Sequence, residues 1–177
     1  MKKAGYIFIA ALLIVIAILG YTLYSVTNKD KTETPQQNPQ SDANTNITYT
    51  VSLYFTSDGI TLSKENREIT VKDKNEIYKS AVSELIKGPS VSGLSSTVHK
   101  DTVLNSVTVS DGVATVDFTE SLITCNTGGS ARESICIQAI CETLFEFEEI
   151  NSVIFTVNDN RIETLGQIDL SDPFYNN

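Results

Sequence analysis

The chain has 177 residues, of which 41% are hydrophobic and 8% aromatic, a composition typical of one globular domain with additional segments rather than of a disordered chain. Without Lys2 and Lys3, 11 basic residues stand against 22 acidic ones, a net charge of about −11. Such a field repels nucleic acid and anionic lipid headgroups, so the composition excludes a nucleic-acid partner.

The first predicted element is an uncharged apolar run at residues 4–26. At about 1.5 Å per helical residue it can cross the roughly 30 Å hydrocarbon layer of a bilayer, and it is too long for the apolar core of a cleaved signal peptide. Because the first cysteine is Cys125, no lipidation site follows the run. Lys2 and Lys3 precede it, and positive charge stays on the cytoplasmic side. Residues 1–27 are therefore predicted to form a cytoplasmic stub and a transmembrane signal anchor.

Residues 28–46 are rich in Gln, Asn, Thr, Pro and Asp, and their largest apolar side chain is Ala43. Such a segment cannot bury enough surface to offset the entropy of ordering it, so we predict a disordered linker with a reach of about 25 Å. Residues 47–177 then form a folded domain outside the cytoplasm.

The domain begins with the alternating stretch YTVSLYF at residues 49–55, which predicts a half-buried strand with Thr50, Ser52 and Tyr54 on its polar side. Asp58 and Gly59 are a turn signal, and residues 60–71 read as two more polar, edge-like segments.

A helix is predicted over residues 74–87, because the apolar residues of DKNEIYKSAVSELIKGP recur at the spacing of one helical face. Asp73 and Glu76 match a capping box at its start, and Gly88 with the following proline is a stop signal at its end.

The stretch SVTVSDGVATVDF, residues 106–118, predicts a hairpin closed by a type I′ turn at Asp111 and Gly112. That turn places Val109 opposite Ala114, Val107 opposite Val116, and Ser106 opposite Asp117. Thr108 and Thr115 then lie on the polar face of the hairpin. Asp117 lies on the same face, so a solvated position explains it without a catalytic role.

The chain continues with a predicted helix at residues 131–148, where Ser130 and Glu133 match a capping box and Glu133 lies on the outer face. The alternating stretch SVIFTV at residues 152–157 predicts a last strand. Since every predicted strand is apolar on one face only, the pattern favours an α+β fold, a two-layer sandwich in which two helices cover one face of a mainly antiparallel sheet.

Residues that could carry chemistry are isolated from one another. His99 has no second histidine or acidic cluster at ligand spacing, and Ser130 lacks the neighbours of a nucleophile or phosphate-binding motif. Cys136 and Cys141 are predicted to be small core residues, while a disulfide between Cys125 and Cys136 remains an alternative. Glu146, Glu148 and Glu149 suggest a solvated face or a docking spot for a basic partner. Turns account for the remaining candidate acids, which are Asp58, Asp159, Asp169 and Asp172.

With these segments in view, the chain resembles the GerMN domain, named for a sporulation and spore germination protein of endospore-forming bacteria. The segments that carry the resemblance, in order, are VSLYFTSDG, AVSELIKGP, LNSVTVSDGVATVDFTESL, GGSARES, AICETLFEFEEINSVIFTVN and ETLGQIDLSDPF, covering nearly all of residues 48–174. The resemblance implies a small α/β module similar to the ring-building domains of the sporulation channel, with no catalytic residues and no cofactor. This chain has one such domain, whereas the best-known members have two, and His99 stands where the family usually has a proline.

We therefore expect a non-catalytic protein of the cell envelope, anchored in the membrane by residues 4–26. Its expected partners are envelope or sporulation proteins, further copies of itself, or peptidoglycan. Binding would use the polar face formed by Thr50, Ser52, Tyr54, Thr108 and Thr115, or an open strand edge. The rival hypotheses are a ligand-binding sensor and a cell-wall enzyme whose acid would be Asp117 with Glu120.

Overall fold

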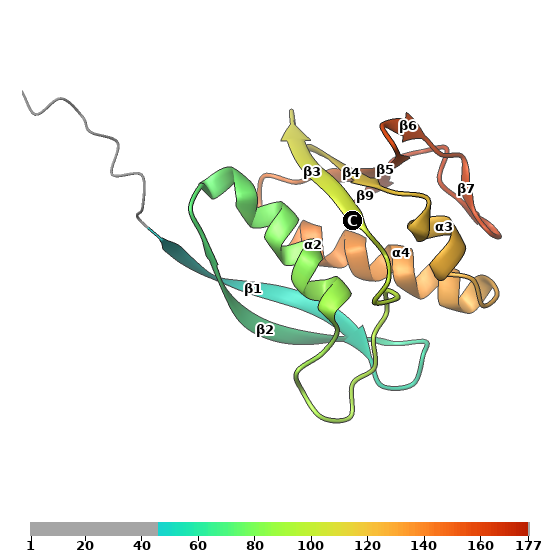
Figure 1. Ribbon diagram of the computed structural model, residues 1–177, viewed down its shortest axis with the longest axis horizontal. Coiled ribbons are helices and arrows are strands. Elements are labelled where there is room, and N and C mark those ends of the chain that lie inside the picture. Colours follow the sequence, from blue (N-terminus) through green and yellow to red (C-terminus); the bar gives the residue numbers. More distant parts are fainter. Residues whose placement is uncertain (1–45, 177) are drawn as a thin grey trace, which may run out of the picture. The chain divides into compact units, whose positions relative to one another are not determined.

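Residues 46–176 are described by a computed structural model of the chain (Figure 1). The predicted membrane anchor at residues 1–27 and the predicted linker, apart from Asn46, lie outside the described residues. Within residues 46–176, no helix has both the length and the apolar character needed to span a membrane.

The first two strands, β1 (Ile47–Thr56) and β2 (Leu62–Val71), form an antiparallel hairpin in which Tyr49 lies opposite Ile69. The alternation along β1 buries Val51, Leu53 and Phe55, as predicted. Residues 60–71 were predicted as two segments, which is wrong, because β2 is one continuous strand. The Asp58 carboxylate accepts hydrogen bonds from the amides of Ile60 and Thr61, at 2.9 and 2.7 Å, and so reverses the chain within a short loop.

The predicted first helix is present as a 3₁₀ turn, η1 (Lys74–Glu76), followed by α2 (Ile77–Lys87). Asp73 caps the turn by accepting a hydrogen bond from the amide of Asn75 at 2.9 Å, so the capping box predicted with Glu76 is replaced by a tighter local cap. The helix ends before Gly88, as predicted, and Gly88 has a φ of 93°.

The central hairpin consists of β3 (Leu104–Ser110) and β4 (Val113–Phe118), and its predicted register is confirmed at Val109–Ala114, Val107–Val116 and Ser106–Asp117. The two turn residues, Asp111 and Gly112, both have positive φ values, 51° and 80°, as a type I′ turn requires.

After the hairpin come α3 (Ser121–Cys125), α4 (Ser130–Phe145) and β5 (Ser152–Val157). The capping box predicted at the start of α4 is absent, since the cap is Gly129 and no side chain bonds there. Glu133 was predicted to face outward but is buried, because the turn at Gly166 and Gln167 packs against its carboxylate, which accepts a hydrogen bond from the Gln167 amide at 2.9 Å.

Strand β5 lies parallel to β4 and pairs on its other side with two short strands, β6 (Asn160–Arg161) and β9 (Phe174–Tyr175). A separate small ribbon is formed by β7 (Thr164–Leu165) and β8 (Ile168–Asp169). The strand pairings of the described residues are therefore mostly antiparallel, with one parallel pair at the centre of the larger sheet.

The α+β class is as predicted, but the prediction of a single sheet with two helices on one face needs correction. The hairpin β1–β2 is not hydrogen-bonded to the sheet β3–β4–β5. Helices α2 and α4 pack against each other, and both contact β1, while α2 also contacts β3 and α4 contacts β5. Figure 1 shows the two helices between the hairpin and the larger sheet. The apolar faces of both sheets therefore contribute to one core, centred on the helices.

Candidate functional site

The five residues of the predicted polar face do not lie on one sheet. Thr50, Ser52 and Tyr54 are on β1, in the separate hairpin, whereas Thr108 is on β3 and Thr115 on β4. Thr50 and Thr108 are exposed, and the other three side chains are half-buried. The structure thus divides the predicted face into two groups, the three residues on β1 and the cross-strand pair Thr108 and Thr115 on the larger sheet.

One end of the outer edge of β1, the edge turned away from β2, is already paired. The backbone of Thr56 exchanges two hydrogen bonds with the backbone of Ser95, at 3.2 and 2.6 Å. The Tyr54 amide donates to the Thr143 hydroxyl at 3.3 Å, and the Thr97 hydroxyl donates to the Tyr54 carbonyl at 3.1 Å. The main-chain groups of the even-numbered β1 residues therefore face this edge.

The rest of the same edge is open. Since main-chain groups alternate along a strand, those of Thr48, Thr50 and Ser52 face the edge that Tyr54 uses. The Ser52 hydroxyl lies 3.3 Å from the side chain of Asn66 across the hairpin, which fits a pair without ladder hydrogen bonds. Among residues 46–176, no hydrogen bond reaches the outer backbone groups of Thr48, Thr50 or Ser52.

A groove of about 300 Å³ lies along this open edge. Its lining combines strand residues with residues from η1, the start of α2 and the segment after α4: Tyr49, Thr50, Val51, Ser52, Lys74, Ile77, Glu146, Phe147 and Glu149. Val51 and Ile77 are buried, and the Phe147 ring packs edge-on against the Tyr78 ring at 5.0 Å between centroids. The groove therefore has an apolar floor beside unpaired main-chain groups. Sequence reasoning missed Lys74, Ile77 and Phe147, because only tertiary packing brings them to β1.

Two carboxylates, Glu146 and Glu149, and one ammonium group, Lys74, line the groove, which leaves it one net negative charge. Glu146 accepts a hydrogen bond from the Tyr54 hydroxyl and forms an ion pair with Lys64, and Glu149 accepts one from the Tyr78 hydroxyl. Burial opposes ionisation of Glu146, but the hydrogen bonds from Lys64 and Tyr54 outweigh it and lower its pKa. The bond from Tyr78 likewise lowers the pKa of Glu149. Both groups are therefore negatively charged at neutral pH.

The hydrogen bond to Glu149 also changes the pKa of its donor, Tyr78. Burial, followed by the hydrogen bond to Glu149, raises the pKa of Tyr78 to about 12. Tyr78 thus remains a neutral donor at neutral pH.

The acidic run predicted at the end of the second helix lies beside β1 in part: Glu146 and Glu149 line the groove, whereas Glu148 is not among its lining residues. Helix α4 ends at Phe145, so these residues follow the helix rather than extend it.

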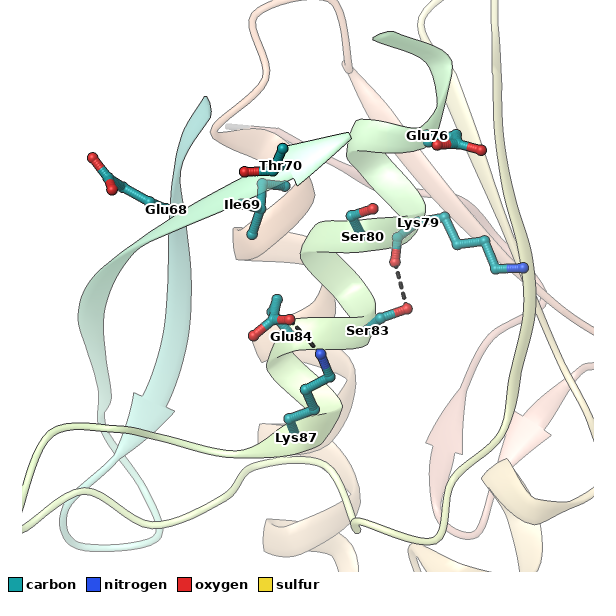
Figure 2. Close-up of a pocket in the computed structure, with 9 residues that line it drawn as sticks. All are labelled: Glu68, Ile69, Thr70, Glu76, Lys79, Ser80, Ser83, Glu84 and Lys87. Atoms are coloured by element: carbon teal, nitrogen blue, oxygen red, sulfur yellow. Dashed lines mark hydrogen bonds and ion pairs between the residues drawn. The ribbon is translucent and has the colours of Figure 1, made fainter. Parts of the chain in front are cut away.

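A second groove, of about 540 Å³, lies between β2 and α2 (Figure 2). Figure 2 shows Lys87 paired with Glu84, and the Ser83 hydroxyl donating to the Lys79 carbonyl at 2.7 Å. Its lining carries charges of both signs and only one buried apolar side chain, Ile69. The groove beside β1 is therefore the stronger candidate site.

Asp117 was predicted to be solvated, which is wrong, since its exposed fraction is 4%. Its carboxylate accepts hydrogen bonds from the Thr156 hydroxyl at 2.7 Å, the Asn105 side chain at 2.8 Å and the Asp159 amide at 2.8 Å. Although burial acts the other way, these bonds lower its pKa. A general acid needs a raised pKa and access to substrate, and Glu120, its proposed partner, is exposed and not bonded to it.

The remaining candidates are separate from the groove. Cys136 and Cys141 are buried core residues, as predicted, and burial raises the pKa of both thiols, that of Cys136 to about 12. Cys125 is half-buried, and all three cysteines of the chain are free. His99 is at the surface, with its ring nitrogen accepting a hydrogen bond from the Asp101 amide at 3.2 Å. Residues 46–176 contain no group of three or more metal-ligating side chains suited to a metal ion.

The chain matches one protein-family model and several solved structures. The family model described as "Germane: Sporulation and spore germination" matches residues 52–163. Among solved structures, the chain is similar to a Clostridium perfringens protein described as a lipoprotein, with 26% identity and a TM-score of 0.54, over 73% of this chain and 87% of the other. No curated protein matches the chain.

Two solved structures from Bacillus subtilis are also similar. The tandem GerMN domains of the sporulation protein GerM match with 25% identity and a TM-score of 0.57, over 73% of this chain and 44% of the tandem protein. The first GerMN domain of GerM matches in fold, with 20% identity and a TM-score of 0.56, over 72% of this chain and 97% of that domain. The chain thus spans less than half of the tandem structure and nearly all of the single domain.

Proposed function

Because the chain belongs to the Germane family of sporulation and spore germination domains, we propose that it is an envelope protein that binds or assembles with other proteins outside the cytoplasmic membrane. The observation that carries this proposal is the open edge of β1 between Thr48 and Ser52, beside a groove with an apolar floor. Such an edge is suited to accept an extended segment of another protein through main-chain hydrogen bonds. The role is binding rather than catalysis.

The proposed location follows from the apolar run at residues 4–26 and is supported by the relatives. A similar Clostridium perfringens protein is described as a lipoprotein, and a lipoprotein is held at the outer surface of a membrane by its lipid. In this chain a transmembrane anchor would serve the same purpose. The domain would then act between the membrane and the peptidoglycan, or between the two membranes of a forespore.

A localisation experiment tests this function in an endospore-forming host. The full chain, with a fluorescent protein fused before Met1, is followed through growth and engulfment beside two variants, Ser52→Pro and Asn66→Pro. Proline at Ser52 removes the amide from the open edge of β1. Proline at Asn66 removes an amide from the outer edge of β2 instead. Because Ser52 and Asn66 are paired in the hairpin, the two prolines should disturb the folding of the hairpin to a similar extent.

We expect the wild-type chain and Asn66→Pro to concentrate at the engulfing membrane, and Ser52→Pro to stay evenly spread over the cell membrane. A wild-type signal that stays uniform through engulfment would contradict the sporulation role. A Ser52→Pro signal that follows the wild type would contradict the use of the β1 edge.

A further inference from the structure

We propose that the groove beside β1 receives an extended segment of a partner protein that carries lysine or arginine, and that this segment pairs with Thr48–Ser52 as an added strand. This assignment rests on the proposed function and specifies the chemistry of the partner. Three properties of the groove support it: the length of the open edge, the apolar floor, and the charge.

The open edge can hold a segment of about five residues. At about 3.3 Å per residue, the stretch from Thr48 to Ser52 is about 17 Å long. Its continuation at Thr56 already accepts another part of the chain in the same manner, because Ser95 exchanges two backbone hydrogen bonds with it. The added strand would therefore extend a mode of pairing that β1 uses at its other end.

The floor of the groove favours alternate side chains of such a segment. In an added strand, every second side chain would point to the face that carries Val51, Ile77 and Phe147, where apolar groups lose contact with water. The intervening side chains would point to the face of Thr50 and Ser52. The groove thus suits an alternating sequence better than a helix, because main-chain donors and acceptors are exposed along β1.

The charge of the groove and of the chain indicates that the partner segment is positively charged. Glu146 and Glu149 are the acidic residues of the lining and Lys74 is its basic residue. Outside the lining, the positive charge of Lys64, which forms an ion pair with Glu146, is balanced by the negative charge of the exposed Glu148, so the surroundings of the groove keep a small net negative charge. Since the whole chain carries a net charge of −9, a second copy would be repelled. A basic segment is therefore favoured over self-pairing.

The test uses a defined probe on the full chain, purified in a neutral detergent. The probe is a seven-residue peptide of alternating lysine and valine with both ends blocked, and its binding is followed by fluorescence anisotropy. One control peptide replaces every lysine by glutamate. A second keeps the sequence but carries a methyl group on every backbone nitrogen, so it cannot donate main-chain hydrogen bonds.

We expect the probe to bind, and each control peptide to bind at least about fivefold more weakly. Ser52→Pro should weaken probe binding at least about fivefold, while Asn66→Pro changes it by less than about twofold. The double variant Glu146→Gln/Glu149→Gln should weaken binding about two- to fivefold, since partly exposed charge pairs contribute modestly. The matched control, Glu142→Gln/Glu163→Gln, removes two exposed charges outside the groove and should leave binding unchanged.

No binding of the probe, equal binding of either control peptide, or equal loss in both proline variants would overturn the assignment. Self-association in analytical ultracentrifugation that Ser52→Pro abolishes would also overturn it, in favour of a second copy as occupant. Each of these results leaves the proposed function testable, because relocalisation of the wild type but not of Ser52→Pro would still support a binding role for the edge.

Discussion

At the scale of single residues, Asp117 shows how a carboxylate can be buried for a structural reason. Asp117 on β4 is opposite Thr156 on β5 in the parallel ladder, and the turn after β5 supplies the Asp159 amide. Three donors therefore satisfy the two carboxylate oxygens. Because they stabilise the charged form, the pKa of Asp117 lies below its ordinary value of 3.8. The residue joins three segments of the larger sheet rather than facing solvent.

Replacing Asp117 by Asn should lower the free energy of unfolding by about 1–3 kcal/mol at pH 7, because one acceptor oxygen becomes a donor facing Asn105. Because the pKa of Asp117 is lower in the folded state than in the unfolded state, its ionised carboxylate stabilises the native state at pH values above the unfolded-state pKa. This stabilisation is lost as the pH falls through the folded-state pKa. The difference between wild type and variant should therefore shrink below about pH 4. Urea unfolding at several pH values measures this difference in unfolding free energy, with Asp111→Asn at the exposed turn as the control.

A difference that stays constant from pH 7 to pH 3 would contradict this account of Asp117. A selective loss of peptidoglycan cleavage, with unchanged stability, would instead favour the enzyme hypothesis.

At the scale of elements, Arg67 ties β2 to the end of α2. Its guanidinium donates to the Glu84 carbonyl at 3.1 Å, the Glu84 carboxylate at 3.0 Å and the Gly88 carbonyl at 3.0 Å, and it forms an ion pair with Glu65. Glu65 is buried and also accepts from the amides of Ser90 and Val91. Arg67 thus donates hydrogen bonds to carbonyl groups at the end of α2, while Glu65 holds the amides of the loop that follows the helix.

The change Arg67→Leu should destabilise the domain by about 2–4 kcal/mol, because it leaves the buried Glu65 carboxylate without its cation. The double variant Arg67→Leu/Glu65→Leu should lose less than the sum of the two single variants, with a coupling of about 1–3 kcal/mol. Chemical denaturation of the four proteins gives this cycle. Arg132→Leu, at an exposed position of α4, should cost less than about 0.5 kcal/mol. Additive single effects would show that the two side chains act separately.

At the scale of the whole molecule, the features that could be predicted from the sequence are local ones. The Asp-Gly pair at residues 111–112 determines the turn of the β3–β4 hairpin and with it the register of the two strands. Alternation along β1 and the helical period of α2 identify their buried faces correctly. Each signal is contained within about fifteen residues, so no knowledge of the tertiary structure is needed.

The features that could not be predicted depend on distant segments. Glu65, Asp117 and Glu133 are buried because their donors come from other elements, which a pattern of charged residues does not reveal. The parallel pairing of β4 with β5 follows from the path of α4 between them. The groove depends on the segment after α4 returning to β1. For the same reason, the predicted five-residue face divides between two sheets.

The open edge of β1 is the central claim at this scale, and amide hydrogen exchange measured residue by residue on the full chain tests it most directly. In the free chain, Thr50 and Ser52 should exchange fast, whereas Val51 and Leu53, which bond to β2, should exchange slowly. Adding the lysine–valine probe should slow Thr50 and Ser52 and leave Asn66, on the outer edge of β2, unchanged. Protection of Thr50 and Ser52 in the free chain, or no protection after the probe is added, would contradict an edge that is open and receives a strand.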